Sequence, residues 1–168
     1  DKTLRVRARL EDFITEISTQ FINLAPQEID NGIQQALEKI GNFAGVDRSY
    51  VFLLRNSHAD NTHEWCAPGI SSAKASRQRV SIESFPWWKS RLRRLRIVQI
   101  TRLADLPPSS QPIKGLLQAH GVKSLLAVPM TLNKDLMGLV GLESLRKEKT
   151  WSKDIISLLK IVADIFIN

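Results

Sequence analysis

Hydrophobic periodicity predicts helices at both ends of the chain. Between Leu4 and Leu24, apolar side chains recur at steps of three and four, the spacing of one face of an α-helix. A second stripe of this kind runs from Ile29 to Ala44. It follows Pro26, which suits a first helical turn, and precedes Gly45, a residue suited to cap a helix end. The third stripe, from Ile155 to Phe166, follows Ser152, whose hydroxyl suits an N-cap.

Alternating apolar residues predict a first β-hairpin. In the run Ser49–Leu54, one face carries Tyr50, Phe52 and Leu54, and the other carries Val51 and Leu53. Because both faces are apolar, we expect a central strand that is covered on both sides. The polar stretch Asn56–Asn61 is expected to form the hairpin loop, and Thr62–Ala67 the shorter second strand.

A second hairpin is predicted near the C-terminus, where the apolar runs Ser124–Thr131 and Leu136–Leu145 flank a turn at Asn133–Asp135. Gly138 and Gly141 would allow close packing of a helix or ligand over this sheet. Between the hairpins we expect helices over Pro86–Leu95 and Pro112–His120, with a strand at Ile97–Thr101. Two hairpins require antiparallel pairing, so the fold class is α+β, with helices on both faces of one sheet.

Composition supports one folded domain over residues 1–168. The chain is 43% apolar and 24% charged, as in an ordinary globular protein, and has no apolar run long enough to span a membrane. Its single cysteine, Cys66, excludes an intrachain disulfide and any zinc site with two thiolates. The chain begins with Asp1 and ends within a helical pattern, so we expect a fragment of a longer protein.

Four short sequence motifs, in their order and spacing, resemble those of the GAF family of sensory domains, which are found beside bacterial histidine kinases and diguanylate cyclases. They are His63–Ile70, Phe85–Trp88, Val122–Met130 and Thr150–Ser152. The resemblance implies a PAS-like antiparallel sheet of five to six strands. It implies terminal helices on one face, with a ligand pocket under short middle helices on the other. Family membership would make the chain a sensory or regulatory module.

The resemblance also suggests where a ligand would bind. We expect the sheet side of the pocket to offer Phe52, Trp65, Leu126 and Val128, and the helix above it to offer Trp87, Trp88 and Arg91. Large rings give a pocket an apolar wall, and an arginine at its rim favours an acid. The ligand is therefore expected to be small, partly apolar and anionic. The alternative is that the tryptophans fill the pocket and leave a structural dimerisation spacer.

The residues indicate neither catalysis nor a cofactor. Some GAF domains attach a bilin to a cysteine, but Cys66 lies on a predicted strand with no histidine after it, so we predict no covalent bilin. The histidines His58, His63 and His120 show no ligand spacing, so we predict no haem or metal. No nucleophile and base are suitably spaced, and the domain is not expected to be an enzyme.

A local excess of charge leaves a further alternative. The stretch from Ser84 to Ala104 contains six Lys or Arg residues and no acid, within a net charge of +7. A basic amphipathic helix can bind an anionic membrane or, with less support here, nucleic acid. We instead expect a homodimer formed through the terminal helices and a kinase or cyclase output domain in the same chain, without nucleic acid. A cytoplasmic location is expected, whether or not the whole protein is attached to a membrane.

Overall fold

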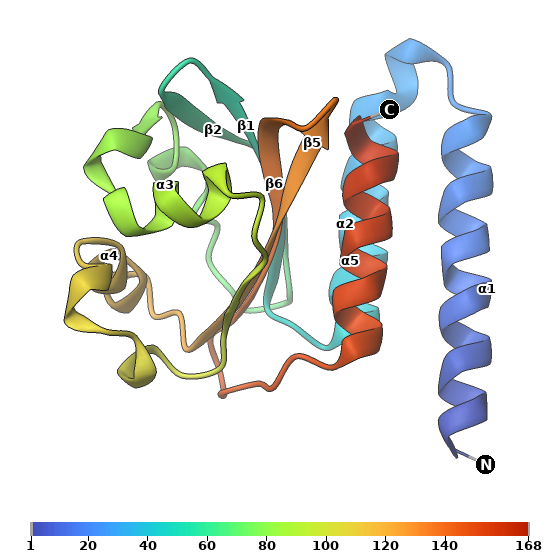
Figure 1. Ribbon diagram of the computed structural model, residues 1–168. Helices are drawn as coiled ribbons and strands as arrows, with labels where there is room; N and C mark the ends of the chain where they lie inside the picture. The colour runs from blue at the N-terminus through green and yellow to red at the C-terminus, as the bar shows by residue number, and fades with distance from the viewer. Residues whose placement is uncertain (1, 168) are drawn as a thin grey trace.

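A six-stranded antiparallel sheet forms the centre of the computed structural model, which describes residues 2–167 (Figure 1). The strand order is β3-β2-β1-β6-β5-β4, and every neighbouring pair is antiparallel. The strands are β1 (Arg48–Arg55), β2 (His58–Cys66), β3 (Val80–Ser81), β4 (Val98–Ile100), β5 (Ser124–Leu132) and β6 (Asp135–Ser144). The predicted fold class and both predicted hairpins are confirmed.

Helices cover both faces of this sheet. On one face lie α1 (Lys2–Ile22), α2 (Ile29–Ala44) and α5 (Lys153–Ile167), and on the other lie α3 (Pro86–Arg93) and α4 (Ile113–Ala119) (Figure 1). The predicted end signals are confirmed: Gly45 follows α2 with φ of +69°, and the backbone N–H of Ile155 donates to Ser152 Oγ at 3.2 Å. Short 3-10 turns span 26–28, 74–76, 82–84, 103–105 and 108–110.

The first hairpin is tighter than its sequence predicts. Its second strand begins at His58 instead of Thr62, so only Asn56 and Ser57 form the turn, with Asn56 at φ of +55°. Arg55 pairs directly with His58, because backbone pairing in an antiparallel ladder continues through polar residues as well as apolar ones. The predicted polar loop is therefore mostly strand.

The two faces of the sheet bury separate apolar cores. Val51, Val140 and Leu142 face α1, α2 and α5, whereas Tyr50, Leu125 and Leu139 face α3 and α4. Successive side chains of a strand point to opposite faces, so β1, β5 and β6 contribute to both cores. The predicted central, doubly covered position of β1 is confirmed.

The wide apolar stripes of the terminal helices are used within the molecule. Helix α1 packs beside α2 and α5, with Phe13 against Phe43 at 4.9 Å between ring centroids and Phe21 against Phe166 at 5.4 Å. Val162 of α5 is 1% exposed. The width of these stripes, which prompted the expectation of a dimer, is therefore explained in large part by packing within one chain.

Candidate ligand-binding site

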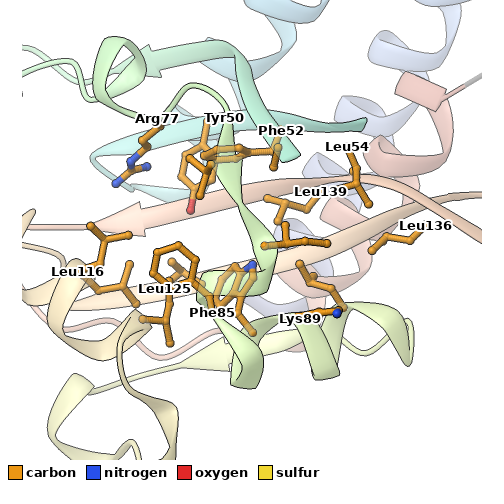
Figure 2. A pocket seen from close by; sticks show the side chains of 18 of the residues that line it. Tyr50, Phe52, Leu54, Arg77, Phe85, Lys89, Leu116, Leu125, Leu136 and Leu139 are labelled. Carbon is orange, nitrogen blue, oxygen red and sulfur yellow. The ribbon is translucent and has the colours of Figure 1, made fainter. Parts of the chain in front are cut away.

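A cavity of about 110 Å³ lies between the sheet and the helices α3 and α4 (Figure 2). An apolar cavity of about 150 Å³ is enough to hold benzene, so this one suits a group of about one ring. Its wall is formed by side chains from β1, β5, β6, the two helices and the residue before α3, among them Phe52, Phe85, Trp88, Leu125, Leu136 and Leu139. The middle of the cavity is apolar.

Alternation along β1 builds one side of this wall. Tyr50, Phe52 and Leu54 all line the cavity, as their period of two predicts. Gly141, opposite Tyr50 on β6, leaves room for the ring, because an added Cβ would lie 2.5 Å from it. The group packed against this glycine is thus a ring of the neighbouring strand, where a helix or ligand was predicted.

A buried ionic cluster closes one end of the cavity. The carboxylate of Glu143, only 1% exposed, accepts hydrogen bonds from Arg48 Nη1 at 3.2 Å and from the Tyr50 hydroxyl at 3.1 Å. Arg77 Nη2 donates to it as well, at 3.2 Å from Oε1 and 3.1 Å from Oε2. Arg48 is also anchored by two hydrogen bonds to the carbonyl oxygen of Ser71. Tyr50, Arg77 and Glu143 all belong to the cavity wall.

The protonation states at this end follow from burial and neighbouring charge. Burial and the charge of Glu143 raise the pKa of Tyr50 well above its ordinary value, so the hydroxyl stays neutral and donates. Burial opposes the charge on Arg77, but Glu143 and Tyr50 raise its pKa above the ordinary value. Burial and Arg77 lower the pKa of His120. Its Nδ1 lies 3.2 Å from Arg77 Nη2 and must accept, which leaves the proton of the neutral ring on Nε2.

The structure divides the residues predicted to form the sheet side of the pocket. Phe52 lines the cavity, whereas Leu126 and Val128 face α5 in the opposite core. Phe52 pairs with Leu139, which pairs with Pro129, so the β5 residues on the cavity side are odd-numbered. A difference of one residue in register moves a side chain to the other face. The predicted facing of Leu126 and Val128 was therefore wrong.

Trp65 also lies on the other face. It pairs with Ser49 on β1, and its ring packs against α2, where a Cβ added at Gly41 would overlap it at 2.2 Å. Ser49, in turn, donates through its hydroxyl to the carbonyl oxygen of Leu37 in α2. The predicted position of Trp65 in the pocket was wrong because its pairing partner on β1 faces the helices.

Of the three residues predicted to contact the ligand from α3, one lines the cavity and two lie outside its wall. Trp88 lines the cavity, while the guanidinium of Arg91 lies 3.8 Å from the ring centroid of Trp87. Arg91 and Trp87 are not among the residues of the cavity wall. The expected anion contact through Arg91 is thus replaced by a stacked pair outside the cavity.

Sequence reasoning missed the polar end of the cavity. Tyr50 could have been predicted from the sequence, since it shares a strand face with Phe52. Glu143 could also have been predicted, because it is a lone acid in an apolar run. Arg77 and His120 gave no such signal, because Arg77 lies in an irregular stretch and His120 follows the end of α4. Only the folded chain brings Arg77 to Glu143, 66 residues later in the sequence.

Half of the basic stretch from Ser84 to Ala104 has partners within the chain. Lys89 forms an ion pair with Glu83, and Arg102 pairs with Glu148 at 3.3 Å between Nε and Oε2. Arg91 is held over Trp87. These contacts weaken the alternative of an anionic membrane or nucleic acid as the partner of this stretch.

Cys66 lies at the end of β2 and is not among the residues that line the cavity. It is partly exposed, and burial followed by the charge of Glu64 raises the pKa of its thiol. Within residues 2–167, no three His, Cys, Asp or Glu side chains gather closely enough to hold a metal ion. No helix in the described part of the chain has the length and apolar character needed to cross a membrane.

Comparison with known proteins gives a family model and a curated relative. The GAF domain model matches residues 28–167. The methanogenesis regulatory histidine kinase FilI of Methanothrix harundinacea (strain 6Ac) is 25% identical over 151 residues, which cover 83% of this chain and 16% of the kinase. The chain therefore spans about a sixth of the length of that relative.

Two solved structures share the fold. The far-red absorbing dark state of JSC1_58120g3 with bound biliverdin IXa has a TM-score of 0.77 at 14% identity, covering 92% of this chain and 96% of the other. The phycocyanobilin-bound GAF domain from a cyanobacterial phytochrome has a TM-score of 0.74 at 16% identity, covering 94% and 91%.

These two structures correct the prediction that the domain takes no cofactor. That prediction relied on the surroundings of Cys66 and on the spacing of the histidines, which describe only two residue types. Domains with the same fold hold biliverdin and phycocyanobilin. The prediction of no bilin is therefore contradicted, because the fold itself is one that accommodates such chromophores.

Proposed function

The chain belongs to the GAF domain family, and from this membership we propose that it is the sensory module of a signalling protein and binds a small molecule in the cavity beneath α3 and α4. The observation that carries the proposal is the cavity itself, with an apolar wall and a charged cluster at one end. Ligand sites in proteins combine these two features, a broad apolar surface and a few placed polar groups.

The open space in the cavity supports a ligand over the dimerisation spacer. In a spacer, the domain's own tryptophans would fill the pocket. Trp88 reaches the wall but leaves the space open, and Trp65 lies on the other face of the sheet.

The signal would pass through the strands that serve both cores. Leu125 lines the cavity, and the next residue, Leu126, packs in the core beneath α1, α2 and α5. A ligand that binds one packing of this sheet better than another shifts the population toward it. The terminal helices would transmit that shift to an output domain elsewhere in the protein, for which a histidine kinase is the candidate favoured by the curated relative.

A thermal-shift screen of small neutral and charged compounds with an apolar body tests the proposal. A ligand at 100 times its Kd stabilises the folded domain by about 2.7 kcal/mol, which raises Tm by roughly 5–10 °C for a chain of this size. The variant Leu139→Phe fills the cavity and should lose this response. Leu132→Phe, at a position 43% exposed and outside the cavity wall, should keep it. A screen without any stabilising compound would reject the proposed function.

A bilin is the second candidate ligand, favoured by the two bilin-bound domains with the same fold. A tetrapyrrole is several times larger than about 110 Å³, so α3 or α4 would have to move outward. Coexpression with enzymes that make biliverdin or phycocyanobilin tests this. A visible absorbance band supports it, and zinc-induced fluorescence after denaturation separates covalent from noncovalent attachment. A colourless protein from both coexpressions would reject this candidate.

Homodimerisation through the terminal helices is a separate proposal, now restricted to the outer surface of α1. Ile22 is 82% exposed and Leu4 is 68% exposed, so this helix presents large apolar side chains to solvent. Sedimentation should show a dimer at high micromolar concentration, weakened by Ile22→Glu. A monomer at that concentration would refute it.

A further inference from the structure

The closed end of the cavity holds more buried positive charge than negative charge. Arg48 is 4% exposed, Arg77 is 7% exposed and Glu143 is 1% exposed. In the described part of the chain, Glu143 is the sole ion-pair partner of both arginines. Tyr50 and His120 beside them are neutral, so the fully buried groups have a net charge of about +1. Glu64, which is partly exposed and outside the cavity wall, adds a negative charge that also acts on Arg77. A buried charge that lacks a counterion is costly, and an anion placed there would remove that cost.

The hydrogen-bonding groups at this end are also unbalanced, with donors in excess. Arg48 uses Nη1 on Glu143 and both Nε and Nη2 on Ser71. Arg77 makes its hydrogen bonds through Nη2, to Glu143 and His120. Its Nε and Nη1, and the Nε2 of His120, donate to no group among residues 2–167. A ligand that brings acceptors, and no further donors, would complement this set.

The rest of the cavity is apolar, so the part of the ligand that occupies it should be apolar as well. Figure 2 shows Arg77 and the Tyr50 hydroxyl at one end and Lys89 at the other, with Phe52, Phe85 and leucines between them. The volume limits this apolar part to about one ring or a short branched chain. One negative charge is what the net charge of the cluster can balance.

We propose that the ligand is a small monocarboxylic acid with an aromatic or aliphatic body, and that its carboxylate is bound by Arg77. This inference rests on the proposed function, namely that the cavity binds a small molecule. A carboxylate accepts hydrogen bonds from a guanidinium in the geometry that arginine favours. His120 Nε2 supplies a further donor on the same wall. Arg77 therefore takes the role that the sequence pattern assigned to Arg91.

Binding of phenylacetate and phenylacetamide, measured by calorimetry, tests the proposal. The two probes have nearly the same size and shape, but only phenylacetate carries a charge. Wild-type protein should bind phenylacetate at least about tenfold more tightly than phenylacetamide, as expected for a charge-assisted hydrogen bond in a partly desolvated site. Arg77→Met should abolish this preference and leave the affinity for phenylacetamide within about threefold. The matched control Arg91→Met, outside the cavity wall, should keep the preference.

Nitrogen NMR of the arginine side chains keeps the test decisive if Arg77→Met does not fold. In wild-type protein, phenylacetate should shift the Nε signal of Arg77, and phenylacetamide should not. Equal affinity for the two probes, or no binding of either, overturns the acid proposal. A preference that persists in Arg77→Met also overturns it and assigns the selectivity to Lys89 and Arg93, which line the cavity as well. The proposed function fails separately, only when the wider screen of neutral and charged compounds finds no ligand.

Discussion

Replacing Glu143 by glutamine should destabilise the domain more than any other single charge removal in this cluster. The side chain is 1% exposed and accepts hydrogen bonds from Arg48, Arg77 and Tyr50. Glutamine has nearly the same volume, so packing is preserved. The substitution removes the negative charge and turns one acceptor oxygen into an NH₂ donor that faces other donors. Among residues 2–167, the only negative charge left near the two buried guanidinium groups is that of Glu64, which is partly exposed and already hydrogen-bonded to Ser72 and Ala73.

The expected cost follows from the burial of all three ions. Removing one partner from a buried ion pair costs about 3–5 kcal/mol, because the remaining charge is neither paired nor hydrated. Domains of this kind have unfolding free energies of about 5–15 kcal/mol, so the loss is a large share of the total. For a chain of this length, about 2–4 °C of Tm is lost per kcal/mol, which gives a decrease of roughly 6–20 °C.

Urea unfolding followed by circular dichroism measures this loss, with Glu83→Gln as the matched control. Glu83 also forms an ion pair, with Lys89, but its side chain is 55% exposed, so solvent screens the pair and the control should lose far less stability than Glu143→Gln. The double variant Arg77→Met with Glu143→Gln should recover part of the stability, because one orphaned guanidinium is gone. A loss in Glu143→Gln no larger than that of the control would refute the reasoning and remove the basis for a positively charged cavity end.

Three further predictions concern the core, the terminal helices and pH. Gly141→Ala should cost about 1–3 kcal/mol in a thermal melt, because its Cβ would lie 2.5 Å from the buried ring of Tyr50, and unchanged stability would contradict that packing. Val162→Asp should unfold the domain, as measured by circular dichroism, because Val162 is 1% exposed. The control Ser157→Asp, at an exposed position of the same helix, should stay folded. A folded Val162→Asp monomer would place this side chain outside the core. The pKa of His120 is lowered in the folded protein, so the unfolded chain binds a proton at this histidine first as pH falls below about 6.5. The neutral ring therefore contributes its full share of the free energy of unfolding above that pH, and this contribution is lost below it. The stability difference between wild type and His120→Gln should therefore shrink between about pH 7.5 and pH 5.5 in urea titrations. A constant difference would argue against a neutral, partly buried ring.

Much of the fold can be read from local patterns in the chain. The steps of three and four at both ends place α1, α2 and α5, and Gly45 and Ser152 mark helix ends as expected. The alternation in β1 identifies which residues share a face, and Tyr50 and Phe52 do lie together on the cavity wall. These features are predictable because each depends on the backbone geometry of a short segment and on its own side chains.

The composition of the cavity depends instead on contacts between distant segments. Phe52 and Leu126 are both apolar strand residues, and only the register from β1 through β6 to β5 puts them on opposite faces. A slip of one residue would exchange Leu126 for Leu125, with no change in the pattern of either strand. Arg77 reaches Glu143 because an irregular segment runs beside β2, where the backbone N–H of Asn61 donates to the carbonyl oxygen of Arg77. No local periodicity reports such long-range pairing, since it is set by hydrogen bonds and packing that exist only once the whole sheet has formed.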